Sequence, residues 1–320
     1  MENHELAGKI YLVAGIRPLT DADRVRGIQI GFAEAALSEL VKKGAKVIAT
    51  YHKTTPSEDF RDNYGENVDY VPFDALDEGS YDKLRHRLAE AGSIDGIVHA
   101  LAKLEALDRR RGLEILRKIK GRKDENQAKV DRGEMPDANI LSWQDFTPEE
   151  QNRAMMITAG SYKKMLSSFH DVLKQDAPVV AYSLKDFKHI PNYAMAPAKD
   201  VLESIAEFYQ DTSGKNVTPL IVRAPAVLTL SSSFFPYINE FLEYMQMLSS
   251  DGRLATSRDI GKFTVDVLQH PEKHEDNRII EYNDGIRINP EELNHILFNK
   301  LSKTPRITDS NIVAVKINLN

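Results

Sequence analysis

A phenol and an ammonium group lie close together in one short stretch of this chain. The strand-like run 177–182 leads into Ser183, and Tyr193 and Lys199 then precede a helical pattern over residues 201–209. A lysine ammonium lowers the pKa of a neighbouring phenol, so that the phenol can give a proton to an oxygen that gains negative charge. These residue types predict hydride-transfer chemistry. Ser183 either hydrogen-bonds a substrate carbonyl or is an ordinary residue at the end of a strand.

The spacing of this pair does not fit one face of a regular helix. Six residues separate the numbers of Tyr193 and Lys199, which leaves their side chains about 120° apart around a helix axis. Pro197 fits best in a first helical turn, and it favours an extended conformation for Ala196. We therefore expect the helix to begin near Pro197 and Tyr193 to lie in the preceding loop. Met195 occupies the position that a Tyr-x-x-x-Lys pattern would need.

Strand-like apolar runs alternate with helical patterns, which predicts a parallel sheet covered on both faces. The expected strands are 9–15, 46–50, 68–72, 94–100, 177–182, 218–222 and 277–282. The expected helices are 27–43, 80–92, 148–174, 197–209, 256–267 and 290–301, with Ser80 and Thr256 as N-caps. The predicted fold class is α/β, a doubly wound Rossmann-type parallel sheet of about seven strands, in a single domain that spans residues 1–320.

Two stretches depart from this alternation. Residues 105–135, the charged insertion, lack a clean apolar stripe and are expected to form an exposed helical insertion or a mobile loop. They follow the fourth strand and so lie at the carboxyl edge, where doubly wound sheets bind ligands. The charged insertion either covers the site, or is a solvated helix, or contacts an acidic partner through Arg109, Arg110, Arg111, Arg117 and Lys118. In the C-terminal extension, 288–320, a β-like run adds to the sheet edge or crosses to another subunit.

Composition sets further limits on the function. Of the 320 residues, 42% are hydrophobic and 28% are charged, and the net charge is −6. Nucleic-acid binding and membrane attachment both favour a basic balance, so neither is expected. The lack of cysteine excludes disulfides and thiol nucleophiles, and the histidines show no metal-ligand spacing, so no metal site is predicted. A polar first segment and the lack of an apolar run of about 18 residues favour a cytoplasmic protein.

Seven short motifs, in their order along the chain, resemble the short-chain dehydrogenase/reductase superfamily, and most specifically its enoyl-acyl-carrier-protein reductases. The motifs are Gly8-Lys9, Gly27-Ile-Gln-Ile-Gly-Phe-Ala33, Thr50-Tyr51, Asp74-Ala75, Asp95-Gly-Ile-Val-His99, Ile190-Pro-Asn-Tyr193 and Thr229-Leu230. The resemblance implies a divergent NAD(P)H-dependent reductase of an enoyl thioester or a carbonyl. Tyr193 would then protonate or hydrogen-bond the developing enolate oxygen, while Lys199 would hold the ribose hydroxyls and lower the pKa of the phenol.

The resemblance also implies where a nicotinamide cofactor binds. The implied residues are Gly15, Ile28, Tyr51, His52, Lys53, Asp74, Ala75, Ala102, Lys199, Val227 and Thr229. An acidic residue at the end of the second strand would favour NADH. Because His52 and Lys53 stand there instead, NADPH has a small preference over NADH, unless Lys53 is only a solvated surface charge.

Four departures from the family pattern leave a second interpretation open. The loop after Gly15 is about six residues longer than the family's phosphate loop and contains both acidic and basic residues. Ala102 stands where the family has glycine, the step from Tyr193 to Lys199 is one residue short, and Pro197 lies between these two residues. The chain is therefore either a reductase or a redox-inactive binding or scaffolding subunit on the same fold.

Assembly and substrate are further expectations from the resemblance. An acyl thioester is the implied substrate, with an acyl carrier protein as a candidate partner. The helices 148–174 and 197–209 are apolar on more than one face, which predicts a homodimer or homotetramer in which a two-fold partner covers them. The aromatic cluster formed by Phe234, Phe235, Tyr237, Phe241 and Tyr244 is either a substrate lid or ordinary packing.

Overall fold

A single parallel sheet forms the centre of the protein. The computed structural model describes residues 5–19, 28–190, 192–225, 227, 236–249, 252–274, 276–282 and 287–303. Within them, seven strands lie in the order β3-β2-β1-β4-β5-β6-β7, and every neighbouring pair is parallel. The strands are β1 (Ile10–Ala14), β2 (Lys46–Tyr51), β3 (Val68–Pro72), β4 (Gly96–His99), β5 (Pro178–Leu184), β6 (Thr218–Ala224) and β7 (Ile279–Glu281). The predicted fold class is confirmed.

The central strands are apolar on both faces because helices cover both faces. All four residues of β4 are buried, as are the first six of β5. Near-continuous apolar runs of this kind are typical of parallel sheets, in which no face meets water. Strand β5 consequently carries its side chains alternately to two separate clusters, with Tyr182 in one and Ala181 in the other.

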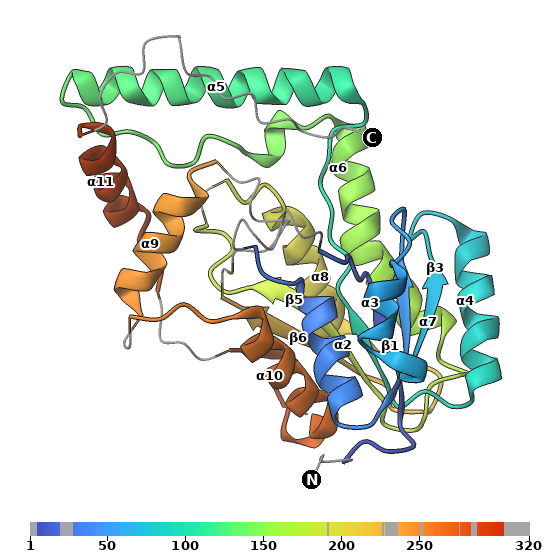
Figure 1. Cartoon of the computed structure of the whole chain (residues 1–320). Coiled ribbons are helices and arrows are strands. Elements are labelled where there is room, and N and C mark those ends of the chain that lie inside the picture. The colour runs from blue at the N-terminus through green and yellow to red at the C-terminus, as the bar shows by residue number, and fades with distance from the viewer. Residues whose placement is uncertain are drawn as a thin grey trace.

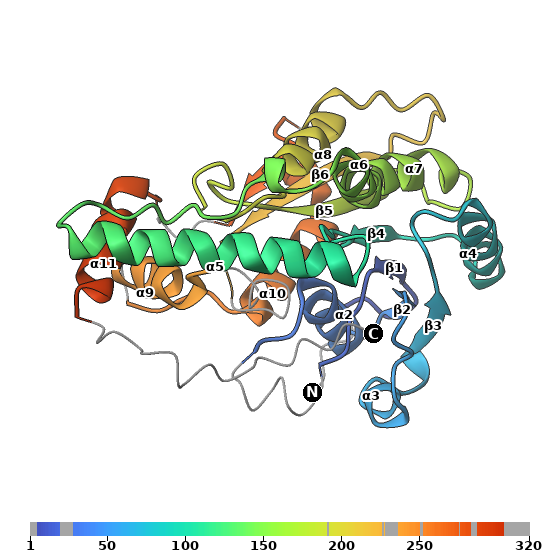
Figure 2. The ribbon, with the colours of Figure 1, turned by 90° about the horizontal axis from the view of Figure 1, so that it is seen from above.

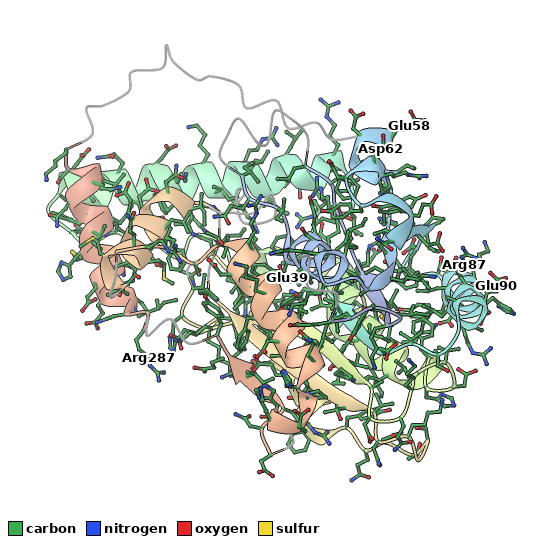
Figure 3. All side chains as sticks on the ribbon, turned by 60° about the horizontal axis from the view of Figure 1, so that its bottom comes forward. Glu39, Glu58, Asp62, Arg87, Glu90 and Arg287 are labelled. Carbon is green, nitrogen blue, oxygen red and sulfur yellow. The ribbon has the colours of Figure 1, made fainter. Side chains whose placement is uncertain are left out.

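Two layers of helices enclose the sheet (Figures 1 and 2). One layer contains α2 (Phe32–Lys42), α3 (Glu58–Asp62) and α10 (Ser257–Gln269). The other contains α4 (Glu78–Ala91), α6 (Pro148–Met155), α7 (Ser161–Ser168) and α8 (Ala196–Phe208). On α4, Arg87 and Glu90 pair at 2.9 Å on the outer side (Figure 3), while Leu84 and Leu88 face the sheet.

Three further helices lie beyond the carboxyl end of the sheet. Helix α5 (Arg109–Asp131) occupies the charged insertion, and α9 (Ile238–Leu248) packs against α11 (Pro290–Leu301). Both views place α5 across the carboxyl edge of the sheet, with α11 near one end (Figures 1 and 2). Among the described residues, no helix combines the length and the apolar character needed to cross a membrane.

Several predicted boundaries are wrong for local reasons. Helix α2 begins at Phe32 rather than at residue 27. Asp77, not Ser80, caps α4, and the Ser80 hydroxyl donates to the Asp77 carboxylate instead. The predicted helix 148–174 contains a π-helical turn, Met156–Gly160, and its last helical residue is Ser168. The motif Thr229-Leu230 and the β-like run 311–318 lie outside the described residues.

Other boundary predictions are confirmed. Helix α8 begins at Ala196 with Pro197 in its first turn, so Tyr193 does lie in the loop before it. The extended conformation expected for Ala196 is wrong, because this residue already belongs to the first turn of the helix. Thr256 and Asp259 form the expected capping box of α10, and α11 has the predicted bounds.

Two helical glycines make a matched stability test. A Cβ atom on Gly261 would lie 2.6 Å from the Ala35 carbonyl carbon and oxygen, whereas one on Gly121 would meet nothing within 4 Å. We predict that Gly261→Ala forces α10 and α2 apart and lowers the free energy of unfolding by about 1–3 kcal/mol. Gly121→Ala should raise it by about 0.5–1 kcal/mol, because alanine favours the helix. Chemical denaturation measures both, and an unchanged stability of Gly261→Ala would contradict this helix contact.

Candidate active site

The first strand ends in a turn that only glycine can form. The chain order reverses beside β1, which neighbours both β2 and β4, and such switch points are where open α/β sheets bind ligands. Gly15 has φ of +99°, and a Cβ atom there would lie 2.8 Å from the Leu101 side chain. The amide hydrogens of Gly15 and Ile16 are both donated to Thr50, at distances of 2.9–3.2 Å. These two amides therefore brace the turn against β2 in this structure.

The start of α2 is the next place where an anion could bind. Gly31 caps the helix without any side-chain hydrogen bond, and a phosphate can complete such a helix N-terminus. The same turn holds Glu34, a carboxylate only 4% exposed, which already complements the helix dipole. Ile28, another predicted cofactor residue, is buried just before the cap. Residues 20–27, which connect the turn after β1 to Ile28, are outside the described part of the chain.

Two of the predicted adenosine-side residues lie together at the ends of β2 and β3. The His52 Nε2 atom is 3.5 Å from the Asp74 carboxylate, and the other Asp74 oxygen accepts the Leu76 amide hydrogen at 2.9 Å. Tyr51 and Ala75 are partly buried, whereas Lys53 and Ala102 are exposed. Val227 is 4% exposed, and Thr229 is not among the described residues. The His52 ring thus lies beside the Asp74 carboxylate, while Lys53 is an exposed cation at this edge.

Lys199 projects from the inner face of α8 to the carboxyl end of β5. Its Nζ atom donates to the Tyr182 carbonyl oxygen at 2.6 Å, and the residue is 5% exposed. Burial lowers the pKa of Lys199 to about 8, against an opposing contribution from Glu203, so the ammonium form predominates at neutral pH. An ammonium group has three donors, and Tyr182 is its one hydrogen-bond acceptor among the described residues. The described residues therefore leave two of its donors unused.

Ser183 follows directly and has an unused hydroxyl group. It is 1% exposed, and its Oγ atom has no hydrogen-bond partner among the described residues. Because side chains alternate along a strand, Ser183 shares a face with Ala181, on the side of the sheet that α8 covers. Buried hydroxyls are normally paired. The unpaired Ser183 Oγ therefore points to a polar group of a ligand at this place.

Tyr193 lies in the loop immediately before α8. It is partly buried and packs with Trp143 against a small cluster of Ala154, Met195 and Ala198. Burial, and next the negative charge of Glu203, raise the pKa of Tyr193. The expectation that Lys199 lowers this pKa is therefore wrong for this structure. The phenol remains protonated at neutral pH and can act as a hydrogen-bond donor.

The sequence analysis missed two polar groups that surround Lys199. His99, at the end of β4, is 1% exposed and lies 2.7 Å from the Ser161 hydroxyl. Burial, and then the charge of Lys199, lower the pKa of His99 to about 3, so this imidazole is neutral. The sequence signal that could have identified His99 is its position at the end of an otherwise apolar strand.

The second missed group is the ion pair of Glu203 with Arg223, whose carboxylate acts on the Lys199 ammonium. Both Glu203 oxygens accept from the Arg223 guanidinium, at 2.9 and 2.7 Å. Glu203 follows Lys199 by four residues, and this spacing on one helix face was visible in the sequence. Glu203 thus has a second cationic partner besides Lys199, whose pKa falls because burial outweighs the opposing charge of Glu203. The described part of the chain has no group of three or more acidic or histidine residues that could hold a metal ion.

The charged insertion is fixed to the protein by buried carboxylates. Glu150, 1% exposed, accepts hydrogen bonds from Arg111 and from the Leu107 and Thr147 amides. Asp145, 4% exposed, accepts two from Arg122, at 2.6 and 2.8 Å. Of the three interpretations of this insertion, its position across the carboxyl edge agrees with a cover. A wholly solvated helix is excluded, and Arg111 is used internally rather than left for a partner.

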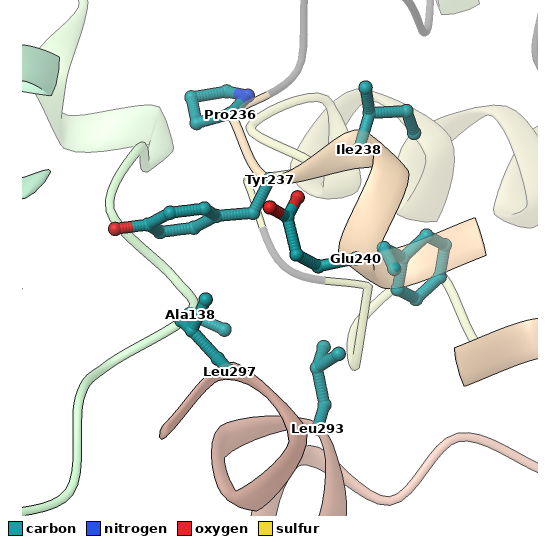
Figure 4. A pocket seen from close by; sticks show the side chains of 8 residues that line it. Ala138, Pro236, Tyr237, Ile238, Glu240, Leu293 and Leu297 are labelled. Carbon is teal, nitrogen blue, oxygen red and sulfur yellow. The ribbon is translucent and has the colours of Figure 1, made fainter. Parts of the chain in front are cut away.

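The predicted aromatic lid packs as a core between helices. Tyr237, Phe241 and Tyr244 join Leu293 and Leu297 of α11 in one cluster. Figure 4 shows the cavity among them, which is about 10 Å³, room for at most one water molecule. The described aromatic residues therefore leave no open channel for an acyl chain between α9 and α11, and Phe234 and Phe235 lie outside the described residues.

Solved enoyl-acyl-carrier-protein reductases match this architecture over most of both chains. The Bacillus cereus enzyme, in complex with NADP+ and an indole naphthyridinone, has a TM-score of 0.68 and 18% identity, over 88% of this chain and 97% of that one. The NADH enzyme of Aquifex aeolicus VF5 has a TM-score of 0.66 and 19% identity, over 88% and 96%. The chain has the fold of the enoyl-acyl-carrier-protein reductases.

A third structure supports the same assignment of the fold. The enzyme of Anaplasma phagocytophilum, in complex with NAD, has a TM-score of 0.63 and 19% identity, over 88% of this chain and 94% of that one. No family model and no curated protein matches the chain. The resemblance that the seven motifs indicate is thus confirmed by structure, at the level of the fold.

The Arg122–Asp145 pair gives a test of how the charged insertion is held. Removing Arg122 leaves a buried carboxylate without its main partner, so we predict that Arg122→Met lowers the free energy of unfolding by roughly 3 kcal/mol. Adding Asp145→Asn in the same chain should restore part of the loss. Arg132→Met is the matched control, because Arg132 pairs with Glu134 on the exposed surface, where solvent screening leaves such a pair with little effect on stability. Equal losses from Arg122→Met and Arg132→Met in chemical denaturation would contradict the structure.

The same pair predicts an acid limit. Burial alone would raise the pKa of Asp145, but hydrogen bonds from Arg122 and the Ser142 amide outweigh it and lower the value to about 2. A carboxyl group whose pKa is lowered in the folded state stabilises the fold at pH values above its unfolded-state pKa of about 4. This stabilisation is lost as the pH falls towards the folded-state pKa. The stability difference between wild type and Asp145→Asn should therefore shrink between about pH 4 and pH 2.

Proposed function

We propose that this protein is a nicotinamide-dependent reductase of an enoyl thioester, with a carbonyl compound as the alternative substrate class. The observation that carries the proposal is the presence of Lys199 and Ser183 at the same end of β5. Among the described residues, two of the ammonium donors and the buried Ser183 hydroxyl have no hydrogen-bond partner there. A ribose with its neighbouring carboxamide or carbonyl has the acceptors that this set of donors needs.

The chain's own residues divide the work between binding and proton control. The coenzyme, when bound, supplies the hydride. Lys199 would hold the ribose hydroxyls, and Ser183 would donate to a carbonyl oxygen. The protonated Tyr193 phenol would donate a hydrogen bond to the thioester oxygen as that oxygen gains charge, which is where an enzyme contributes most to the transition state. The neutral His99 adds no competing positive charge beside Lys199.

The choice between the two coenzymes rests on the residues after β2. Lys53 is exposed there, and the His52 ring lies 3.5 Å from the Asp74 carboxylate. We propose NADPH as the preferred coenzyme, with NADH as the alternative, because a lysine can meet a 2′-phosphate and no acidic residue follows β2 directly.

A specific observation also favours the redox-inactive alternative. The Gly15 and Ile16 amides are both occupied by Thr50, so they do not offer hydrogen bonds to a pyrophosphate. A chain that has lost nucleotide binding would keep the fold and serve as a binding or scaffolding subunit. Nucleotide binding itself distinguishes the two proposals.

The reductase proposal predicts coenzyme oxidation that depends on one phenol. Purified protein with NADPH or NADH and a short enoyl thioester should consume the reduced coenzyme, and Tyr193→Phe should lower kcat by about 10²–10⁴ with little change in the KM for the coenzyme. Tyr209→Phe is the control, since Tyr209 lies at the far end of α8 with its hydroxyl near the Leu166 carbonyl. No oxidation with any short enoyl thioester or ketone would remove the proposal. A melting temperature that neither nucleotide raises would favour the redox-inactive alternative.

Assembly into a homodimer or homotetramer is a further proposal. Much of the predicted two-sided apolar arc belongs to the chain's own core, because Tyr162, Met165, Phe169 and Leu202 are fully buried. A stripe on the outer side of α8 remains, in which Val201 is 40% and Phe208 is 79% exposed, with the partly buried Ile205 between them. A two-fold partner would cover this stripe.

Charge in that stripe should therefore separate the subunits. We predict that light scattering at micromolar concentration gives a multiple of the 36.1 kDa chain mass for the wild type and a mass near one chain for Val201→Glu/Phe208→Glu. Met247→Glu is the control, because Met247 is 73% exposed on α9, away from this stripe. A wild-type mass near one chain would refute the assembly.

A further inference from the structure

The residue before Tyr193 is a fully buried asparagine with a left-handed backbone. Asn192 is 1% exposed and has φ of 60°. Asparagine tolerates this conformation better than most residues, because its short polar side chain can bond locally. Here the side chain bonds to distant segments instead. A strained, buried residue beside a candidate acid suggests that its conformation is fixed for a purpose.

Asn192 uses every polar group that it directs into the protein. Its Nδ2 atom donates to the Ala138 and Pro236 carbonyl oxygens, at 3.0 and 2.8 Å. Its Oδ1 atom accepts the Leu141 amide hydrogen at 2.8 Å, and its own amide donates to Asn139 Oδ1 at 2.9 Å. These four bonds join the Tyr193 loop to the chain that returns from α5 and to the residue just before α9.

Two other asparagines hold the same returning chain, the segment 137–141. Asn126 of α5 donates to the Asp137 carbonyl and accepts the Asp137 amide hydrogen, and Asn294 of α11 accepts the Ala138 amide hydrogen at 2.9 Å. The segment is not part of the sheet, so side-chain amides satisfy backbone groups that a strand ladder would otherwise satisfy. Asn192 connects this support to the loop that carries Tyr193 through three hydrogen bonds, while Ala138 and Leu141 share apolar clusters with residues of the same loop.

We propose that Asn192 is a positioning residue, which holds the Tyr193 phenol in place by fastening its loop to the segment 137–141 and to Pro236. This inference rests on the proposed reductase function. In a helix, a tyrosine seven residues before the lysine would be aligned by helical register alone. Here Tyr193 precedes the helix, so that register is lost, and the four hydrogen bonds of Asn192 replace it. The segment that follows α5 then also fixes the position of the Tyr193 phenol.

Asn192→Asp tests the inference while keeping the size and backbone preference of the residue. The carboxylate can still accept from Leu141, but it cannot donate to the Ala138 and Pro236 carbonyls. We expect kcat to fall at least about tenfold, because small displacements of a reacting group have effects of this size, with the KM for the coenzyme within about twofold of wild type. Asn192→Gly, which tolerates the positive φ, should show the same pattern if the aspartate variant does not fold.

A double-variant comparison separates positioning from general damage. In a Tyr193→Phe background, Asn192→Asp should lower the residual kcat by less than about twofold, since residues that act through one group are not additive. The same loss in both backgrounds would overturn the proposal, as would an unchanged kcat in Asn192→Asp. Asn294→Ala is the matched control, because it removes one amide contact to the same segment without touching the Tyr193 loop, and its kcat should stay within about twofold.

Two further tests apply if the Asn192 variants do not fold or if the wild type is inactive. They are the variant Asn139→Ala and a fluorescence measurement. Asn139 is exposed, so its removal spares the fold and deletes only the acceptor of the Asn192 amide; kcat should fall by about threefold. Trp143, the one tryptophan of the chain, packs against the same small cluster as Tyr193, and acrylamide should quench it more readily in Asn192→Asp than in Asn294→Ala. If the wild type reduces nothing, the proposed function fails while this fluorescence difference still tests the tether. Equal quenching in both variants would overturn the tether even in an active enzyme.

Discussion

A buried ammonium group at the end of β5 is the constraint on which the rest of the site depends. Lys199 is almost inaccessible to solvent, yet its pKa of about 8 leaves it charged at neutral pH. A buried charge must be balanced nearby, and Glu203 supplies the opposite charge one turn further along α8. Arg223 already holds both Glu203 oxygens, which limits that balance and keeps the ammonium short of acceptors. The neutral state of His99 and the unpaired hydroxyl of Ser183 both fit a place where a polar ligand completes the set.

Local signals in the sequence were sufficient for the fold and for part of the site. Apolar runs placed all seven strands, and the position of Pro197 located the start of α8. The same reasoning failed where the deciding contact is not local. The Asp77 cap was overlooked because Ser80 offered an equally good side chain, and nothing in the periodicity of 148–174 marks the π-helical turn at Met156–Gly160. Long-range pairing, such as that of Asn192 with the segment 137–141, has no signature in a single sequence.

The charged insertion shows why charge density alone is a poor guide to solvation. Its arginines are ordinary in the sequence, but Arg111 and Arg122 reach carboxylates that lie 39 and 23 residues further along the chain. Buried pairs of this kind add little net stability over an apolar contact, because desolvation offsets the attraction, and their best-attested use is to select one arrangement. For α5 that arrangement is a fixed orientation across the carboxyl edge. Apolar packing is not directional and would allow this long helix to shift along its axis, whereas two directional ion pairs set both its position and its rotation.

The displaced pKa values of Lys199 and Tyr193 have opposite chemical consequences. The pKa of Lys199 is lowered towards neutrality, but the side chain remains mainly protonated, so it can donate hydrogen bonds to hydroxyl groups. The pKa of Tyr193 is raised by burial and by the charge of Glu203, so the phenol cannot act as a base at neutral pH. Oxidising an alcohol needs a group that takes a proton, whereas reducing an enoyl thioester needs one that donates to a growing negative charge. A phenol held protonated is suited to the second task. On the proposed function, Tyr193 therefore acts as a hydrogen-bond donor, and Asn192 matters because a hydrogen-bond donor acts only when it is aimed.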